Sequence, residues 1–200
     1  MLELWLIRHG ETTWNAEKRI QGQSNSQLSD LGIKQAKSLA PRLKDIDFDY
    51  VYASDLDRAT HTARLALPGA EPMLDKRLRE IHFGVLEGKC HAEFNDTEAK
   101  LYAFYKEDPY ERRIEGGECW RDLGDRIESW LKELPKEGKA VAFSHGGTIR
   151  SALFRLIGYP ENYEWTAFFA NTGITRILID EGLVTLITVN DHAHIEGLTN

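Results

Sequence analysis

The sequence lacks any long uninterrupted hydrophobic run, which argues against a segment that crosses a membrane. Such a segment needs roughly 18 consecutive apolar residues. The apolar run at residues 4–7 lies between Glu3 and Arg8 and is too short for the hydrophobic part of a secretion signal. We therefore expect a cytoplasmic protein that has no membrane partner.

Cysteine is also scarce, since the 200 residues include only Cys90 and Cys119. The two are distant in sequence, so they indicate neither a disulfide framework nor a pair of neighbouring metal ligands. Repeats, low-complexity tracts and linkers are missing as well. These absences favour a single domain over residues 1–200, and a chain of this length can bury a substantial core.

An excess of positive charge is missing too, because the formal net charge is −7. General affinity for nucleic acid or anionic lipid is therefore not expected. A small anionic substrate can still bind to a local cluster of arginines. Apolar residues make up 42% of the chain and charged residues 28%, so the composition indicates an ordinary globular protein.

Short apolar runs alternate with helical patterns along the chain. Ser29 is a plausible N-cap for one helix, and Ser54 with Asp57 resembles a capping pair for the next. The predicted strands lie at residues 2–7, 50–53 and 139–144. The predicted helices lie at about 29–43, 54–67, 122–134 and 148–157. A closing hairpin is predicted at residues 175–179 and 183–189. This alternation predicts a three-layer α/β/α fold. Its sheet would be mainly parallel with one antiparallel edge strand, and a small flap insertion would cover about residues 88–117.

Polar groups follow three of the predicted strands, at residues 8–10, 54–58 and 145–147. In parallel α/β sheets, ligands bind beyond the carboxyl ends of the strands. We therefore expect this topology to bring the three groups together, although they are distant in sequence.

His9 ends the first apolar strand and is followed by Gly10, which permits close approach of another group. A neutral imidazole nitrogen is a good nucleophile toward phosphorus, and this chemistry requires no metal. Taken alone, His9 is as readily explained as a strand-capping residue that satisfies local hydrogen bonds.

The neighbours of His9 favour phosphoryl transfer, which needs charge stabilisation over three phosphate oxygens. Arg8 and Arg58 supply two guanidinium groups at two strand ends, and His145 adds a third possible positive donor. Glu80 is the best candidate for the general acid that protonates the leaving oxygen, and its carboxylate can then activate water. For each residue a surface ion pair or a solvated position remains the simpler alternative.

The opening of the chain resembles that of the histidine phosphatase superfamily, also called the phosphoglycerate mutase-like family. The matching segments are Leu6-Ile7-Arg8-His9-Gly10-Glu11-Thr12 with Asn15 and Gln21-Gly22, Leu28-Ser29-Asp30-Leu31-Gly32 with Gln35-Ala36, residues 54–63, Leu78-Arg79-Glu80 with Phe83-Gly84 and Glu87-Gly88, Ser144-His145-Gly146-Gly147, and Asn171-Thr172-Gly173. The segments agree in order and spacing over nearly the whole chain, so the resemblance is specific.

The resemblance implies a role for each matching position. His9 would be the residue that is phosphorylated in the intermediate, Arg8, Arg58 and His145 would complete the phosphate pocket, and Glu80 would be the proton donor. The residues that would add contacts to the phosphate or the leaving group are Asn15, Gln21, Gly22, Gly146 and Thr172.

The resemblance also leaves several functions open. Only about thirty residues separate Gly88 from the next predicted helix, which favours a phosphatase over the longer mutases of the family. The chain looks most like short bacterial broad-specificity phosphatases, and it also resembles alpha-ribazole phosphatases. A cofactor-dependent phosphoglycerate mutase and a non-catalytic phosphate-binding module are the alternatives.

The flap gives two conflicting indications about the substrate. Its aromatic residues could contact an apolar leaving group or could pack beneath the flap; they are Phe94, Tyr102, Phe104, Tyr105 and Tyr110. Arg112 and Arg113 could instead pair with a substrate carboxylate. The expected partner is a small phosphorylated substrate, and a second copy of the chain is a possible partner.

No cofactor is expected. His192 and His194 could suggest a metal pair, but no Cys or carboxylate cluster completes it, so no metal site is expected.

Overall fold

The computed structural model of the chain describes residues 1–158 and 168–198. Within these residues the centre is one six-stranded sheet with the order β3-β2-β4-β1-β5-β6. The strands are β1 (Leu2–Arg8), β2 (Tyr50–Ala53), β3 (Met73–Leu74), β4 (Gly138–Ser144), β5 (Ile174–Asp180) and β6 (Leu183–Asp191). The strands that the sequence predicts are present, and the two-residue β3 is an addition. A single domain over residues 1–200 stays a prediction, since that range includes residues outside the description.

The directions of the strands confirm a mainly parallel sheet with an antiparallel edge. β1 and β2 are both parallel to β4, and β3 is parallel to β2. β5 runs antiparallel to β1, and β6 runs antiparallel to β5 and forms the outer edge. The register of β1 with β4 places Arg8 opposite Ser144, so the two strands end side by side.

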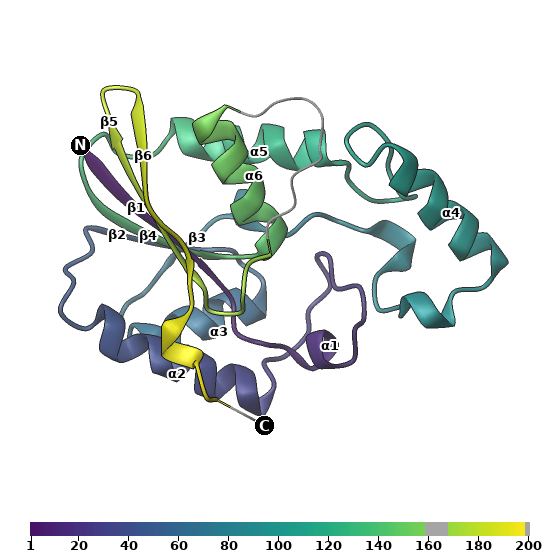
Figure 1. Ribbon diagram of the computed structural model, residues 1–200, viewed down its shortest axis with the longest axis horizontal. Helices are drawn as coiled ribbons and strands as arrows, with labels where there is room; N and C mark the ends of the chain where they lie inside the picture. The colour runs from purple at the N-terminus through teal and green to yellow at the C-terminus, as the bar shows by residue number, and fades with distance from the viewer. Residues whose placement is uncertain (159–167, 199–200) are drawn as a thin grey trace.

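Helices cover both faces of this sheet, as Figure 1 shows, with α2 and α3 on one side and α5 and α6 on the other. The helices are α1 (Thr13–Ala16), α2 (Asp30–Leu43), α3 (Asp57–Ala66), α4 (Asp96–Glu107), α5 (Trp120–Lys132) and α6 (Gly146–Ile157), with 3-10 helices η1 (Lys76–Leu78), η2 (Gly84–Leu86), η3 (His91–Glu93) and η4 (Ala193–Ile195). The three-layer α/β/α prediction is therefore confirmed.

The core lies in two hydrophobic clusters on opposite faces of the sheet. Leu4 and Leu6 of β1 belong to the cluster under α5 and α6, whereas Trp5 and Ile7 belong to the cluster under α2 and α3. Neighbouring residues of a strand point to opposite faces, so the apolar run of β1 serves both layers. This double burial fixes the position of the residues at the carboxyl end of β1.

The first turns of the helices differ in part from the sequence prediction. Ser29 is the N-cap of α2 as predicted, and its hydroxyl accepts a hydrogen bond from the Gly32 N–H. The capping pair predicted from Ser54 and Asp57 is wrong, because the N-cap of α3 is Leu56. The Ser54 hydroxyl instead contacts His145 and is used in the site described below.

The flap at residues 88–117 contains α4, which Figure 1 shows projecting away from the sheet. A capping box formed by Asn95 and Glu98 starts this helix. Its packing is limited, because the flap rests on a small cluster with Leu86, Tyr105 and Ile114 at the centre. The flap is thus joined to the body by far less apolar packing than α2, α3, α5 and α6.

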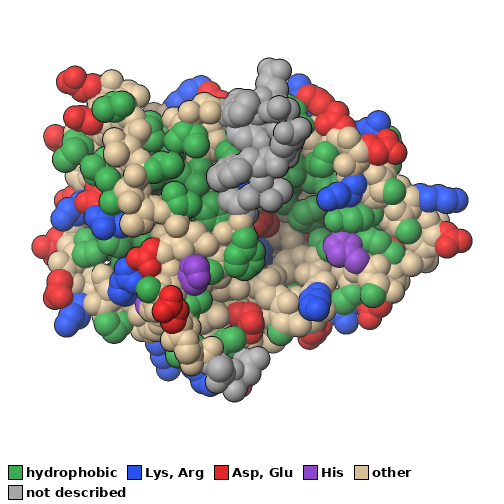
Figure 2. Space-filling model, in the orientation of Figure 1, with side chains coloured by type: hydrophobic (Ala, Val, Ile, Leu, Met, Phe, Trp, Pro, Cys, Tyr) green, Lys and Arg blue, Asp and Glu red, His purple; other side chains and the backbone are tan. Residues whose placement is uncertain are grey.

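The surface shows mixed charge and one apolar edge. Figure 2 shows acidic and basic side chains interspersed among the coloured residues of the face in view. The edge strand β6 exposes Leu183, Leu186, Ile187 and Val189. Across residues 1–158 and 168–198, every helix is too short or too polar to cross a membrane.

Candidate active site

A cavity of about 290 Å³ opens beyond the carboxyl ends of β1, β2 and β4. Its walls come from segments that are far apart in sequence: the end of β1, the loop that contains α1, the start of α3, the segment after η1, and the flap. The lining residues are Arg8, His9, Trp14, Asn15, Lys18, Arg19, Ile20, Gln21, Gly22, Arg58, Glu80, Phe83, His91 and Tyr102. Seven of these residues are predicted from the sequence to belong to the site: Arg8, His9, Asn15, Gln21, Gly22, Arg58 and Glu80.

His9 lies directly after β1 and is only 3% exposed. Its Nδ1 donates a hydrogen bond to the Gly10 carbonyl oxygen over 2.7 Å, which leaves Nε2 with a free lone pair. Burial, followed by the positive charges of Arg58 and Arg8, lowers the pKa of His9 well below its ordinary value. The ring is therefore neutral at pH 7, as a nucleophile must be.

The segment before β5 forms hydrogen bonds with the backbone of His9. The Asn171 side chain donates to the His9 carbonyl oxygen at 3.0 Å, and the Thr172 N–H donates to the carbonyl oxygens of Arg8 and His9. The Thr172 hydroxyl accepts a hydrogen bond from His194 Nε2 of η4. Thr172 does not line the cavity, and its backbone supports the end of the strand that carries His9, so its contact with phosphate stays a prediction.

Arg58, in the first turn of α3, is only 1% exposed. Nη1 donates to the Ser24 carbonyl oxygen at 2.9 Å, Nη2 to the Gly22 carbonyl oxygen at 2.6 Å, and Nε to His145 Nδ1 at 3.2 Å. Burial is the main cause that lowers the pKa of Arg58 to about 10, so the guanidinium stays charged at pH 7. Each Nη carries a second N–H that can bind a phosphate oxygen.

His145 is the residue between β4 and α6, and it is fully buried. Its ring centre lies 5.1 Å from that of His9. Burial, Arg58 and His9 lower the pKa of His145 well below its ordinary value. The sequence suggested a positive donor here, whereas the structure contains a neutral ring whose nitrogens contact Arg58 and Ser54.

Arg8 brings the second guanidinium to the cavity from the last position of β1. Its Nη1 donates to the Phe169 carbonyl oxygen at 2.5 Å. Its Nε is buried, and within residues 1–158 and 168–198 it has no hydrogen-bond partner. A buried N–H donor without a partner is unusual, so this atom is suited to bind an oxygen of a ligand. Gly146, predicted for the same pocket, is the first residue of α6 and lies beside Arg8.

Glu80 lies two residues after η1, and its carboxylate reaches the start of α6. Oε2 accepts a hydrogen bond from the Gly147 N–H at 3.0 Å, and Oε1 accepts one from the Ile81 N–H at 2.9 Å. A Cβ atom at Gly147 would lie 2.3 Å from Oε1, so a side chain at this position would displace the Glu80 carboxylate. These contacts aim the carboxyl group at the cavity that His9 also lines.

The loop around α1 forms a polar rim. Thr12 caps α1, and its hydroxyl contacts both the Asn15 and the Gln21 side chains. Gly22 has a φ of +53°, and its carbonyl oxygen accepts the hydrogen bond from Arg58. The predicted positions Asn15, Gln21 and Gly22 are therefore tied to the site by contacts within the described structure.

The outer part of the cavity was mostly missed by the sequence reasoning. We call Trp14, Phe83, His91 and Tyr102 the outer wall; all four line the cavity on the side of α1 and the flap. The rings of Tyr102 and His91 contact each other in a tilted arrangement, with ring centres 4.5 Å apart. Only Tyr102 was considered from the sequence, because the other three carry no spacing signal that links them to the strand ends.

The flap arginines and most flap aromatics do not face the cavity. Arg112 pairs with Glu107, and Arg113 pairs with Asp122, and neither lines the cavity. Tyr105 is buried in the flap cluster, while Phe104 is exposed under the Arg112 guanidinium. Of the flap residues suggested from sequence for substrate contact, Tyr102 alone is in a position to make it.

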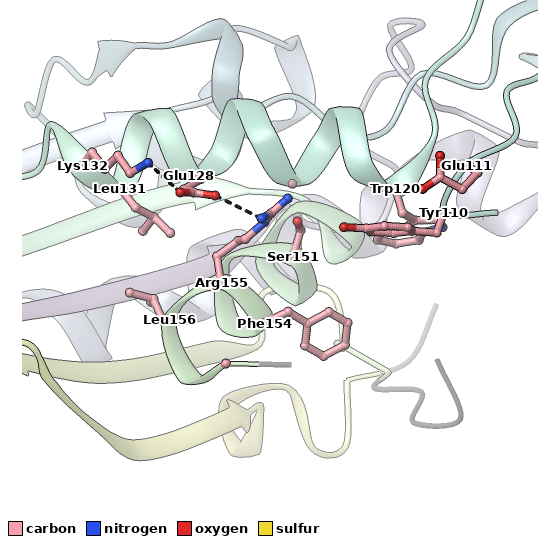
Figure 3. Close-up of a pocket in the computed structure, with 12 residues that line it drawn as sticks. Tyr110, Glu111, Trp120, Glu128, Leu131, Lys132, Ser151, Phe154, Arg155 and Leu156 are labelled. Atoms are coloured by element: carbon pink, nitrogen blue, oxygen red, sulfur yellow. Dashed lines mark hydrogen bonds and ion pairs between the residues drawn. The ribbon is translucent and has the colours of Figure 1, made fainter. Parts of the chain in front are cut away.

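A second and larger cavity of about 790 Å³ lies between α5 and α6. Figure 3 shows Glu128 of α5 between Lys132 and Arg155, with Trp120 and Phe154 farther along the cavity. None of the residues at the strand ends lines this cavity. It is therefore separate from the candidate active site.

The described residues contain no group of three or more His, Cys, Asp or Glu side chains that could hold a metal ion. His192 Nδ1 contacts the Asn190 carbonyl oxygen, and His194 Nε2 contacts Thr172, so these two rings serve local structure.

Comparison with known proteins gives concordant results. The family model described as histidine phosphatase superfamily (branch 1) matches residues 4–192. A protein of Escherichia coli O1:K1 / APEC named "Probable phosphoglycerate mutase GpmB" is 34% identical over 207 residues, covering 98% of this chain and 96% of that protein.

Solved structures give the same picture. The alpha-ribazole phosphatase from Shigella flexneri superposes with a TM-score of 0.88 at 32% identity, covering 99% of this chain and 100% of that one. A mutant phosphoserine phosphatase from Entamoeba histolytica, in complex with phosphoserine, has a TM-score of 0.85 at 30% identity and covers 98% of this chain and 100% of that one.

Proposed function

The chain belongs to the histidine phosphatase superfamily and is a phosphomonoester hydrolase that works through a phosphohistidine, and we propose that His9 is the residue that carries the phosphoryl group. The observation that supports this assignment is the buried, neutral His9 ring, with Nδ1 bonded to Gly10 and Nε2 free. We also propose that Arg8 and Arg58 bind the phosphate, that His145 holds the Arg58 guanidinium in place through its Nδ1, and that Glu80 is the acid.

In the first step His9 Nε2 attacks phosphorus, and the bond between phosphorus and the ester oxygen breaks. Arg58 and Arg8 stabilise the charge on the phosphoryl oxygens, because their guanidinium groups are fixed and need no reorganisation during the reaction. Glu80 gives its proton to the leaving oxygen, which departs as an alcohol. The products of this step are the alcohol, phosphohistidine and the Glu80 carboxylate.

In the second step a water molecule attacks the phosphohistidine and the P–N bond breaks. The Glu80 carboxylate accepts a proton from that water, which restores the acid for the next turnover. Inorganic phosphate leaves and His9 returns to the neutral form. One ester and one water have then given one alcohol and one phosphate.

The substrate that suits this cavity is a small phosphomonoester with an apolar or aromatic part in its leaving group. The volume of about 290 Å³ is near the lower limit for small-molecule sites, so a large substrate would extend outside. One end of the cavity, lined by Arg8, His9 and Arg58, is the phosphate end in this proposal. Beyond it, the lining includes the rings of Trp14, Phe83 and Tyr102. Burial of apolar surface against these rings would add affinity for such a leaving group.

A sugar-acid phosphate is the second candidate, favoured by the exposed Lys18 at the rim. Within the described residues Lys18 forms no ion pair, whereas its neighbour Arg19 pairs with Glu17 and Glu93. A cation of this kind could bind a substrate carboxylate. The flap arginines cannot take this role in the observed arrangement, because they pair with flap and α5 carboxylates.

A direct test compares p-nitrophenyl phosphate, phosphoserine and 3-phosphoglycerate as substrates of the wild type and of His9→Ala, with and without a chelator. The proposal expects hydrolysis by the wild type that a chelator does not affect and that His9→Ala loses. Brief reaction with labelled substrate should trap phosphate on the protein in an acid-labile, base-stable form. Full activity of His9→Ala would refute the assignment of His9, and a strong preference for 3-phosphoglycerate would favour the second substrate class.

A further inference from the structure

Glu80 comes from a segment without regular structure, so something outside that segment has to fix its position. The segment between η1 and η2 spans residues 79–83. The carboxylate of Glu80 bonds to Gly147 and Ile81, as described above, but these contacts do not hold the backbone before it. A general acid must lie within hydrogen-bond reach of the leaving oxygen, so the backbone position matters for the reaction.

The guanidinium group of Arg126, on α5, binds the backbone of this segment and of the residues just before it. Nη1 donates to the carbonyl oxygens of Arg77 and Arg79 at 2.6 and 2.7 Å, and Nη2 donates to the Glu80 carbonyl oxygen at 2.8 Å. The remaining N–H groups, on Nε and Nη2, donate to the two carboxylate oxygens of Glu118 at 2.9 and 3.0 Å. All five donors of the side chain are therefore used.

Glu118 completes the arrangement from the other side of the acid. Its Oε2 accepts a hydrogen bond from the His82 N–H at 3.0 Å, and its own N–H donates to the His82 carbonyl oxygen at 2.8 Å. The exposed fractions of the Arg126 and Glu118 side chains are 17% and 22%, so water competes little for these bonds. Together the pair contacts the backbone at residues 77, 79, 80 and 82.

We propose that Arg126, held by Glu118, is a positioning residue that sets the place of the Glu80 carboxyl group relative to the leaving oxygen. The inference rests on the proposed role of Glu80 as general acid. Neither Arg126 nor Glu118 lines the cavity, so neither touches the substrate. Their effect on the reaction passes through the backbone of the acid.

This role predicts a loss that depends on the leaving group. Nitrophenolate is a weak base and departs without a proton, whereas the alkoxide of glycerol 2-phosphate needs one. The value of kcat/KM reports the reaction up to release of the leaving group, and thus isolates the step in which Glu80 donates. For Glu80→Gln we expect kcat/KM to fall by about 10²–10⁴-fold on glycerol 2-phosphate and by far less on p-nitrophenyl phosphate.

The decisive variants are Arg126→Met and Glu118→Gln, measured on both substrates. Arg126→Met should lower kcat/KM on glycerol 2-phosphate by about 10–100-fold and on p-nitrophenyl phosphate by less than about threefold, since a displacement near 1 Å has effects of this size. Arg126→Lys should recover part of the loss, because lysine keeps the charge but has only three donors. Glu118→Gln keeps the shape of the side chain and should give a smaller loss with the same selectivity.

Arg155→Met is the matched control. Like Arg126, Arg155 is an arginine that pairs with carboxylates, here Asp125 and Glu128 of α5, and within the described residues no bond joins it to residues 77–82. It should change kcat/KM on both substrates by less than about twofold. Suppose that Glu80→Gln shows the selectivity for glycerol 2-phosphate. Equal losses of kcat/KM on both substrates in the Arg126 and Glu118 variants, or no loss, would then overturn the positioning role. Absence of selectivity in Glu80→Gln itself would refute the acid assignment, and the positioning role with it.

Discussion

The two ends of the cavity are built in different ways. The end proposed to bind phosphate lies at the ends of buried strands and is lined by Arg8, His9 and Arg58. Each of these side chains has a hydrogen-bond partner in the protein, and the partner of Arg58 Nε is His145. The outer wall comes from α1, from a loop and from the weakly packed flap. The rings of His91 and Tyr102 contact each other, and Phe83 and Tyr102 pack against the flap cluster. The proposed function thus places the chemistry on the well-packed part of the molecule, and substrate selection on a part that can vary without disturbing the core.

The largest difference between the two ends should come from removing the nucleophile. His9→Ala removes Nε2, so the covalent route is lost, and kcat should fall by about 10⁴-fold or more, as for other enzymes that lose a nucleophile. Trp14→Ala in the outer wall should mainly raise KM, because it removes contact area and no reacting group. Steady-state assays on p-nitrophenyl phosphate give both values. A His9 variant with a kcat close to that of the Trp14 variant would show that the two ends are not functionally distinct.

Two arginines provide the next test of the comparison. Arg58 is buried with all three nitrogens bonded, whereas Arg112 is in the flap and pairs with Glu107. Arg58→Lys cannot reproduce these bonds together with a two-pronged phosphate contact, so kcat/KM should fall by about 10²–10³-fold. Arg112→Lys should change it by less than about twofold, since an exposed ion pair contributes little. Comparable losses of kcat/KM in Arg58→Lys and Arg112→Lys would contradict the functional difference between the phosphate end and the flap.

The phosphate end could be predicted from the sequence because its residues follow apolar strands. The runs at residues 2–7 and 139–144 identify two neighbouring parallel strands, and the rule that ligands bind at their carboxyl ends then joins His9 with His145. Ser54 was assigned to a helix cap, because a serine followed three residues later by an acidic residue is the usual pattern of a capping box. Its hydroxyl instead contacts His145, a partner distant in sequence that no local pattern can indicate.

The outer wall could not be predicted in the same way. Its members line one side of the cavity because the flap packs on η2 and on Ile20, and this packing depends on tertiary contacts rather than on a period or a strand end. The structure also gives Thr172 a contact that the sequence does not indicate. The match of residues 171–173 to the family indicates proximity to the site, whereas only the structure shows the Thr172 N–H behind the His9 backbone.

Two aromatic residues of α4 test whether the outer wall selects the substrate. Tyr102 lines the cavity, while Phe104 on the same helix is exposed and does not. Tyr102→Ala should raise KM for an aryl phosphate by about 3–10-fold through lost apolar contact, with kcat less affected. Phe104→Ala should leave KM unchanged. If both variants raise KM equally, the effect belongs to flap stability and not to contact with the leaving group.

The smallest expected effect concerns His194, whose ring contacts Thr172 behind the His9 backbone. It is a dependence of the free energy of unfolding on pH. Burial, followed by the charge of Arg42, lowers the pKa of His194 to about 4, against an ordinary value near 6.5 in the unfolded chain. Between these pH values the unfolded chain binds a proton that the folded protein does not. The free energy of unfolding must therefore fall as the pH drops from 6.5 toward 4, and this contribution stops changing below pH 4.

His194→Gln should reduce that slope, because it removes the group whose pKa differs between the two states. One such proton contributes about 1.4 kcal/mol per pH unit, and partial exposure of His194 reduces the expected change to at most about 1 kcal/mol per pH unit. Urea unfolding at pH 7, 6 and 5 measures the wild type and the variant. An identical slope in the wild type and His194→Gln would show that His194 binds a proton as easily in the folded protein as in the unfolded chain. The packing of His194 against Thr172 would then not be tight enough to exclude the charged ring.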